Sequence, residues 1–300
     1  MLKVHFHTHH DHGIAMHKIA QYLMEYKPDE VEVTSFADCD INIEHIIGDH
    51  GISKCAHDKQ LISRMKQKKF VLLWYCFERS LDYIKNSKFF NWAFSDATMI
   101  YSYLVFENYG FKEQDNVVYG PLGYDHTFFK FDNKIERLSN SIMSTGYIAS
   151  TECLEEIYNA CKQARATMFH VGHNFNWNRI IYRQGEKLTE EQMRLIYASA
   201  TFVSGLRRGE GFEIPVLEGA ACGARPIVFN KSHYQWYKDF AIFIEESNFY
   251  EVRDSIYNVL LENINNPNIT TSEEERKKIR ETFGWDVIAK RFWEEVLRRV

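Results

Sequence analysis

The sequence has few of the features that mark proteins outside the ordinary globular class. It holds only 5 prolines and 15 glycines among 300 residues, and it has no short repeat or low-complexity tract. Its longest strongly apolar run, FVLLWYCF at 70–77, is far too short to cross a bilayer. The beginning of the chain, MLKVHFHTHH, has no basic segment followed by an apolar one, so no signal peptide is visible. These absences predict a globular, cytoplasmic protein without an integral membrane segment.

A large excess of charge of one sign is also missing. The net charge is -5 and the pI is near 6.2, so the chain has no general attraction to polyanions, which disfavours nucleic-acid binding. The 6 cysteines are scattered without a CxxC pair, which predicts reduced and mostly buried thiols. Aromatic residues, in contrast, make up 15% of the chain and indicate large cores and stacking surfaces.

Apolar runs bounded by turns alternate with segments of helical period, which is typical of α/β layers. The predicted strands are KVHFH, EVEVTSF, FVLLWYCF, ATMIYSY and NVVYGPLGYD, followed after a polar linker by SIMSTGYI, ATMFHVGHN and TFVSGL. TEEQMRLIYASA predicts a helix capped by Thr189, and DVIAKRFWEEVLRRV predicts a strongly amphipathic terminal helix. Two open sheets joined in this way predict two domains whose strand ends face each other, with a ligand between them.

The segment RGEGFEIPVLEGAACGARPIVFN at 208–230 carries the strongest functional signal. Glu210 and Glu218 are separated by seven residues, with glycines before, between and after them. We predict a strand-to-helix junction in which Gly209 and Gly211 let the backbone approach a ligand. The helix that holds Pro215 in its first turn offers free amide protons to phosphate or sugar oxygens, and the Glu218 carboxylate suits both hydroxyls of a ribose.

The stretch EGFEIPVLEGAACGARPIV resembles the donor-binding segment of retaining glycosyltransferases of the GT-B fold, in particular family 4, whose pattern is close to EGFG-LP-LEAMACG-P-V. The positions in register are Glu210, Gly211, Phe212, Pro215, Leu217, Glu218, Ala221, Cys222, Gly223 and Pro226. The resemblance covers almost the whole chain. GIAMHKIAQYL is similar to the first glycine loop and helix, NVVYGPLGYDHTFF to the turn that closes the first domain, and FGWDVIAKRFWEEV to the terminal helix.

This resemblance implies an α/β protein of the GT-B fold, with two Rossmann-like domains facing each other across a cleft. It implies an acceptor-side domain at 1–132, completed by a helix at about 285–300, and a nucleotide-sugar-binding domain at 140–284. The implied activity is a hexosyltransferase reaction (EC 2.4) that moves a sugar from a nucleotide donor, UDP- or GDP-sugar, to an acceptor with retention of configuration. The donor is a co-substrate, and neither a cofactor nor a metal is expected. The acceptor, whether a glycan, a small molecule or modified DNA, and the oligomeric state stay open.

The sequence departs from the family at the cations that hold the donor diphosphate. The family places Arg and Lys in a GR-x4-KG segment, whereas the matching segment here, GYIASTECLE, has Tyr147 and Glu152 at those positions. A buried diphosphate needs positive partners. Arg207 and Arg208, directly before the glycine turn, are therefore predicted to have taken over the role.

The resemblance assigns the remaining candidate residues by position. The predicted catalytic residues are Glu210, Arg207, Arg208 and His12, and the predicted donor-binding residues are Gly13, Arg183, Leu188, Gly211, Phe212, Glu213, Ile214 and Glu218. Phe212 either stacks on the ligand or plugs the space under the loop, and the plug is favoured. Glu213 replaces the family's usual glycine and either reaches the sugar or caps the helix N-terminus. Arg183 and Leu188 either flank the nucleobase or belong to a surface turn.

Two further motifs compete with this interpretation. His5 and His7 in HFHTHHDHG have the spacing of the first ligand pair of PHP-type metal phosphoesterases, but no second ligand cluster follows, so a strand with a polar loop is favoured. The basic RMKQKKF at 64–70 either docks on a membrane or is a solvated helix end, and the helix end is favoured. Two alternative functions also remain: a virus-type glycosyltransferase acting on modified DNA bases, and a non-catalytic sugar-nucleotide binder.

Overall fold

The computed structural model of the chain describes residues 1–8, 14–48, 59–76, 81, 85–146, 149–172, 177, 180–184, 188–209, 211–265 and 269–300. It divides into two compact units. The first comprises Met1–Gly123, Gly209–Phe212 and Trp285–Val300, and the second comprises Tyr124–Arg208 and Glu213–Gly284. The chain therefore leaves the first unit after Gly123, contributes the short segment Gly209–Phe212 to it, and returns to it finally at Trp285.

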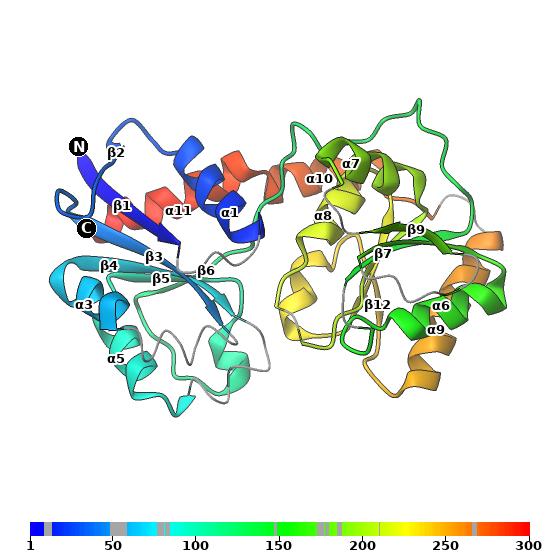
Figure 1. Ribbon diagram of the computed structural model, residues 1–300, viewed down its shortest axis with the longest axis horizontal. Coiled ribbons are helices and arrows are strands. Elements are labelled where there is room, and N and C mark those ends of the chain that lie inside the picture. The colour runs from blue at the N-terminus through cyan, green and yellow to red at the C-terminus, as the bar shows by residue number, and fades with distance from the viewer. Residues whose placement is uncertain are drawn as a thin grey trace. The chain divides into compact units, whose positions relative to one another are not determined.

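The first unit is a parallel six-stranded sheet with helices on both faces (Figure 1). Its strand order is β2-β1-β3-β4-β5-β6, and the strands are β1 (Leu2–Thr8), β2 (Val31–Val33), β3 (Ile41–Gly48), β4 (Lys69–Cys76), β5 (Met99–Ser102) and β6 (Val117–Tyr119). One face is covered by α1 (Ile14–Glu25) and α11 (Trp285–Arg299), and the other by α3 (Lys59–Gln67) and α5 (Lys88–Asp96). A short 3-10 helix, η2 (Phe106–Tyr109), precedes β6.

The second unit is also a parallel six-stranded sheet between two helical layers. Its strand order is β12-β11-β10-β7-β8-β9, and the strands are β7 (Ser141–Gly146), β8 (Thr167–Gly172), β9 (Ile180–Gln184), β10 (Phe202–Gly205), β11 (Arg225–Phe229) and β12 (Ile242–Ile244). The helices α6 (Leu154–Ala164) and α9 (Phe249–Asn265) pack together on one face. The other face carries α7 (Glu190–Ser199), α8 (Ile214–Ala221) and α10 (Glu273–Phe283), and η3 (Ser232–Tyr237) follows β11.

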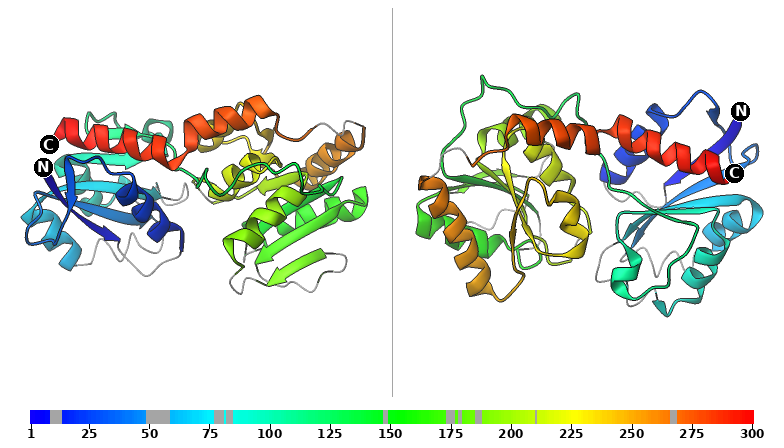
Figure 2. Two further views of the ribbon diagram at one scale, coloured as in Figure 1. Left: turned by 90° about the horizontal axis from the view of Figure 1, so that it is seen from above. Right: turned by 180° about the vertical axis from the view of Figure 1, so that it is seen from behind.

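The terminal helix α11 is part of the core of the first unit, beside α1 (Figure 2). Its buried residues are Trp285, Ile288, Ala289, Phe292, Trp293 and Val296, which recur at the spacing of one helix face. The indole of Trp293 donates a hydrogen bond to the carbonyl oxygen of Leu23 at 2.7 Å, and Trp285 stacks on Tyr22. The predicted amphipathic helix is thus confirmed.

Local signals at helix ends and in the core agree with the sequence. Thr189 caps α7 through a capping box with Gln192, and Ser272 caps α10 in the same way with Glu275. The four cysteines that the structure describes as free thiols are all buried, at positions 39, 153, 161 and 222, as predicted. No helix in the described part of the chain has both the length and the apolar character that a bilayer crossing requires.

Each sheet has a switch point, where the strand order reverses direction along the chain. In the second unit it lies between β7 and β10, and in the first unit between β1 and β3. Chains leaving the carboxyl ends of two such strands turn to opposite faces of the sheet and leave a crevice, which is where open α/β sheets bind ligands. The residues at these two points are the candidates for function.

Candidate functional site

The segment 208–230 forms the strand-to-helix junction that its sequence predicts. Strand β10 ends at Gly205, α8 begins at Ile214 with Pro215 in its first turn, and β11 begins at Arg225. A Cβ added to Gly205 would lie 2.5 Å from the Val216 side chain, so a glycine is needed where α8 packs on the strand. Gly223 ends the helix with a φ of 104°, a left-handed conformation that glycine adopts without strain.

Arg207 joins the loops that follow β7 and β10, at the switch point of the second sheet. Its Nη1 lies 2.6 Å from a carboxylate oxygen of Glu152, and its Nε lies 3.0 Å from one of Glu213. Its Nη2 donates to the hydroxyl of Thr145 at 2.8 Å and to the Thr145 carbonyl oxygen at 3.2 Å. The three charged side chains are 4% to 13% exposed. At least four of the five guanidinium protons are therefore committed inside this unit.

A glycine explains how Glu152 reaches this position. Gly146, the last residue of β7, has a φ of 147°, and a Cβ there would lie 1.9 Å from the Glu152 carboxylate. A Cβ on Gly172, at the end of β8, would lie 1.8 Å from the Gly146 carbonyl oxygen. The ends of these two strands therefore lie close together only because both end in glycine. The Glu152 carboxylate occupies the space that a side chain at position 146 would need.

Two of the three sequence departures from the resembled pattern are partners of Arg207. Glu152 stands at the position of the family's lysine, and Glu213 at the position of the usual glycine. Glu213 is the N-cap residue of α8, but its side chain makes no capping hydrogen bond. Its carboxylate pairs with Arg207 instead, while its backbone N–H donates to the Tyr237 hydroxyl at 3.0 Å.

Arg208 is held within the second unit as well. Its Nη2 lies 3.0 Å from Glu156, and its Nη1 donates to the Ser247 carbonyl oxygen at 2.9 Å. A second carboxylate, Glu246, lies 3.5 Å from Nη1 and 2.7 Å from the ammonium group of Lys231. Around the loop, the cations Arg207, Arg208 and Lys231 face the carboxylates of Glu152, Glu156, Glu213 and Glu246. An anionic ligand that binds to these cations therefore competes with the carboxylates.

Glu218 lies one helical turn into α8, with its side chain half-buried. It stands beside the hydroxyl of Tyr197, a fully buried residue of α7. Burial raises the pKa of Tyr197 well above its usual value, and the neighbouring Glu218 carboxylate raises it further. Burial, together with the Glu218 charge, also raises the pKa of the Cys222 thiol to about 12. Tyr197 and Cys222 are thus protonated neighbours of this carboxylate at neutral pH.

Comparison with known proteins establishes the fold. Neither a family model nor a curated protein matches the sequence. Among solved structures, HepE of Anabaena in complex with UDP-glucose superposes with a TM-score of 0.74 at 12% identity, over 100% of both chains. Sucrose-phosphate synthase of Thermosynechococcus elongatus gives 0.69 at 11% identity, over 97% of this chain and 80% of that one. A glycosyltransferase from Rickettsia africae gives 0.65 at 10%, over 100% and 99%. The chain has the GT-B fold.

The other predicted site residues fall into three groups. His12, Gly13, Tyr147, Glu210 and the side chain of Arg183 lie outside the described residues. Leu188 and Ile214 are half-buried, just before α7 and at the first residue of α8, and Gly211 is buried. Phe212 belongs to the first unit, is 2% exposed, and packs against Tyr103 with 5.7 Å between ring centroids, an environment that suits a buried plug.

A charged cluster at the switch point of the first unit was not predicted from the sequence. Glu44 on β3 is fully buried and accepts hydrogen bonds from Asn42 at 2.6 Å and from Arg64 at 2.9 Å. The Nδ1 atom of His7, on the neighbouring strand β1, lies 3.0 Å from the other carboxylate oxygen. Burial by itself would raise the pKa of Glu44, but the hydrogen bonds from His7 and Arg64 outweigh it and hold that pKa below its ordinary value.

This cluster includes one residue from each of the two competing motifs, the basic stretch 64–70 and the histidine-rich first strand. Arg64 opens the basic stretch 64–70, and its side chain is only 18% exposed because it is paired with Glu44. His7 pairs with the same carboxylate. In the parts of the chain that the structure describes, no three His, Cys, Asp or Glu side chains come together in a way that could hold a metal ion.

Proposed function

We propose that the chain is a retaining glycosyltransferase of the family 4 type, which works in the cytoplasm and transfers a hexosyl group from a nucleotide sugar to an acceptor. The observation that carries the proposal is the placement of segment 208–230. It follows strand β10 at the switch point of a GT-B domain and supplies the loop before α8, the helix α8 with Glu218 one turn inside it, and strand β11. HepE, which has the same fold, was solved with UDP-glucose, and this favours a UDP-sugar as donor.

In the proposed complex, α8 binds the donor through its first turn and through Glu218. The amide groups at the start of a helix have no helical acceptor and attract phosphate oxygens. Glu218 lies four residues after Ile214, about 6 Å along the axis, on the same side of the helix. A ribose on Glu218 would therefore place its phosphates near the start of α8. Gly211, Ile214, Leu188, Arg183 and Gly13 are the other proposed donor contacts, and Phe212 is the buried plug under the loop.

Arg207 is the proposed partner of the diphosphate, together with Arg208. When the bond between the sugar and the phosphate breaks, negative charge builds up on the leaving diphosphate, and a guanidinium fixed beside it lowers the barrier. Because Arg207 is paired with Glu152 and Glu213, the diphosphate would take over hydrogen bonds that these carboxylates make in the structure. Glu210 and His12 are the other proposed catalytic residues, and we propose no role for a metal.

Thermal-shift and turnover measurements with UDP-, GDP- and ADP-sugars test the proposal. A ligand present at 100 times its Kd stabilises the folded protein by about 2.7 kcal/mol, which is a measurable rise in Tm. We expect a UDP- or GDP-sugar to raise the Tm of the wild type and to be consumed, with EDTA having no effect. As a control, the exposed Glu191→Gln variant should behave as the wild type. If no nucleotide sugar changes the Tm, the proposed function is wrong.

One observation favours a second candidate, a non-catalytic sugar-nucleotide binder. Both arginines that replace the family's diphosphate cations are engaged with carboxylates of their own unit. A binder needs only the contacts of α8, whereas catalysis also needs a cation on the leaving group. Nucleotide-sugar binding without release of nucleoside diphosphate, in the presence of a mixed pool of acceptor sugars and lipids, would identify the binder.

A further inference from the structure

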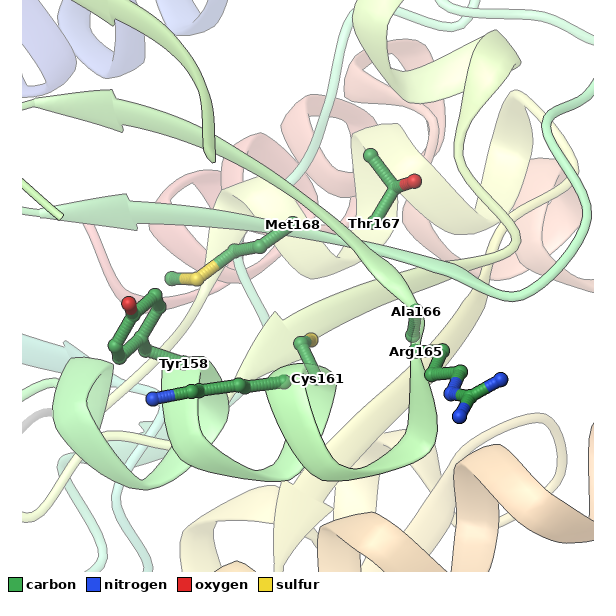
Figure 3. Close-up of a pocket in the computed structure, with 7 residues that line it drawn as sticks. Tyr158, Cys161, Arg165, Ala166, Thr167 and Met168 are labelled. Carbon is green, nitrogen blue, oxygen red and sulfur yellow. The ribbon is translucent and has the colours of Figure 1, made fainter. Parts of the chain in front are cut away.

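A cavity of about 490 Å³ opens in the second unit between α6 and the first residues of β8 (Figure 3). It is lined by Tyr158, Cys161, Lys162, Arg165, Ala166, Thr167 and Met168. Its volume lies within the range of sites that bind small molecules. The cavity is at the amino end of β8, whereas Arg207 and the glycine ends of β7, β8 and β10 are at the carboxyl end. The six residues of β8 separate the two places by roughly 17 Å.

One end of the cavity is apolar and aromatic. The Tyr158 ring is stacked on Trp177, with centroids 4.8 Å apart and planes 18° from parallel. Met168 is 1% exposed, and Figure 3 shows its side chain reaching toward the Tyr158 ring. A tyrosine fixed in this way by a second ring presents a rigid face to a flat ligand group at little cost in side-chain entropy.

Two of the residues that line the cavity are cations, Lys162 and Arg165. Arg165 follows Tyr158 by seven residues, which is about 10 Å along α6, and Lys162 lies between them on the same helix face. Both cations are exposed, and within the described residues neither forms an ion pair. Of the other arginines in the same unit, those at positions 194, 207, 208, 225 and 253 pair with carboxylates, whereas Arg137 and Arg276 donate to backbone carbonyl oxygens.

Arg165 also has an unusual backbone conformation. It is the C-cap residue of α6 and has a φ of 54°, in the left-handed region where glycine is the easiest residue. The dipole of α6 favours a cation at this end, but it does not account for the cavity or for the aromatic wall at the far end.

We propose that this cavity is a second ligand site, which binds a small molecule that combines an aromatic ring with a phosphate group. The ring lies against Tyr158 and Met168, and the phosphate binds Arg165 and Lys162 through charge-assisted hydrogen bonds. A nucleoside monophosphate and a simple aryl phosphate share this chemistry. The site does not depend on the proposed donor site, because the two lie at opposite ends of the sheet and have no residue in common.

Calorimetric titration of the full chain with phenyl phosphate and with AMP tests the proposal. Inorganic phosphate and phenol serve as the two halves of the ligand. The test variant is Lys162→Gln/Arg165→Asn, because glutamine suits a helix and asparagine tolerates the left-handed conformation. The matched control is Lys277→Gln/Lys290→Gln, which removes two exposed helical lysines elsewhere. Glu218→Ala serves as the control for the donor site.

We expect at least one ring-bearing phosphate to bind the wild type, the lysine control and Glu218→Ala with the same Kd. The Kd should rise by about tenfold or more in Lys162→Gln/Arg165→Asn, because two charge-assisted contacts are lost. Inorganic phosphate and phenol should each bind more weakly. Tighter binding of AMP would assign a nucleotide and tighter binding of phenyl phosphate an aryl phosphate, and either supports the site.

Three results would overturn the proposal. The first is that neither ring-bearing phosphate binds at millimolar concentration. The second is an unchanged Kd in a folded Lys162→Gln/Arg165→Asn variant. The third is a loss of binding in Glu218→Ala, which would place the ligand in the donor site. The Tm of each variant, measured without ligand, shows whether it is folded.

Discussion

The two units build their switch points with opposite charge arrangements. In the first unit, an anion is at the centre: Glu44 is fully buried on β3, and Arg64 and His7 reach it from the periphery. In the second unit, a cation is at the centre: Arg207 is held between Glu152 and Glu213. The two sheets are alike in strand number and direction. The comparison shows that one architecture accommodates a buried carboxylate in one copy and a shared guanidinium in the other.

The two clusters differ in the charge that remains when their arginine is removed. Without Arg207, two nearly buried carboxylates lose their cation. Without Arg64, one fully buried carboxylate keeps a histidine and an amide as its partners among the described residues. Because an uncompensated buried charge costs far more than a lost surface pair, we expect large effects in both units and the larger one in the second.

Arg207→Met should show the largest effect. The free energy of unfolding should fall by about 3–5 kcal/mol, because Glu152 and Glu213 lose the guanidinium group that offsets their burial. The kcat/KM for nucleotide-sugar turnover should fall by about 100-fold or more, since charge on the leaving diphosphate is no longer stabilised. Denaturant unfolding and initial rates measure the two quantities.

A triple variant separates the structural role of Arg207 from the proposed catalytic one. Arg207→Met combined with Glu152→Gln and Glu213→Gln should regain most of the stability but not the activity. Arg207→Lys should rescue the activity only in part, because lysine cannot reproduce the bidentate fork. Full activity in the triple variant would contradict the role of Arg207 in turnover.

Arg64→Met should destabilise the protein by about 3 kcal/mol, since Glu44 loses the partner that offsets its burial. Glu44→Gln should cost less, because the amide keeps the shape without the charge. Glu44 has a folded-state pKa below its unfolded value, so its contribution is complete above the unfolded value and disappears as the pH falls through the lower folded value. In the acid range below the ordinary glutamate pKa, wild-type stability should therefore fall more steeply than that of Glu44→Gln. Equal slopes in urea unfolding series would show that Glu44 is not held ionised.

Glu218→Ala should weaken nucleotide binding by about 1–3 kcal/mol, the loss expected when hydrogen bonds to a charged group are removed. Calorimetry with UDP and GDP measures the change. Glu191→Ala, an exposed acid on α7, is a matched control with no expected effect on affinity. Unchanged affinity in a folded Glu218→Ala variant would remove Glu218 from the donor site.

The effect that is smallest at neutral pH, because it develops only in acid, concerns one buried histidine in each unit. Burial lowers the pKa of His45 in the first unit and of His233 in the second to about 3. In the unfolded chain each takes up a proton near pH 6.5, so below that pH each should reduce stability by about 1.4 kcal/mol per pH unit until its folded-state pKa is reached. His45→Leu should remove one such slope between pH 6 and 4 in denaturant unfolding. A slope identical to that of the wild type would mean that His45 is protonated in the folded state.

The sequence predicted those elements whose signals are local. The junction around α8 followed from glycines and a proline at the right offsets, the start of α7 from its cap residue, and α11 from its apolar period. Strand β3 was not predicted, although it lies in the middle of its sheet. Its run INIEHII interrupts the apolar pattern with Asn42, Glu44 and His45, and the partners that make these residues tolerable lie far away in the sequence.

The candidate site shows the same limit. The sequence indicated that Arg207 replaces a missing cation, but not that its partners are the very residues that depart from the family pattern. Glu152 is 55 residues away from Arg207, and no local pattern reports an ion pair of that separation. The cavity beside Tyr158 was also not predicted, because a helix face and a strand end reveal a space only when their packing is known.

The return of the chain to the first unit at Trp285 has a consequence for biosynthesis. Ribosomes add about 5–20 residues per second, so α11 emerges on the order of ten seconds after residue 123. Until then, Phe6 and Tyr101, which pack against Trp293 and Phe292, lack their cover. The second unit has all of its own chain by Gly284. In the order of synthesis, the second unit is therefore complete before the first, and the apolar face of the first sheet under α11 stays uncovered for longer.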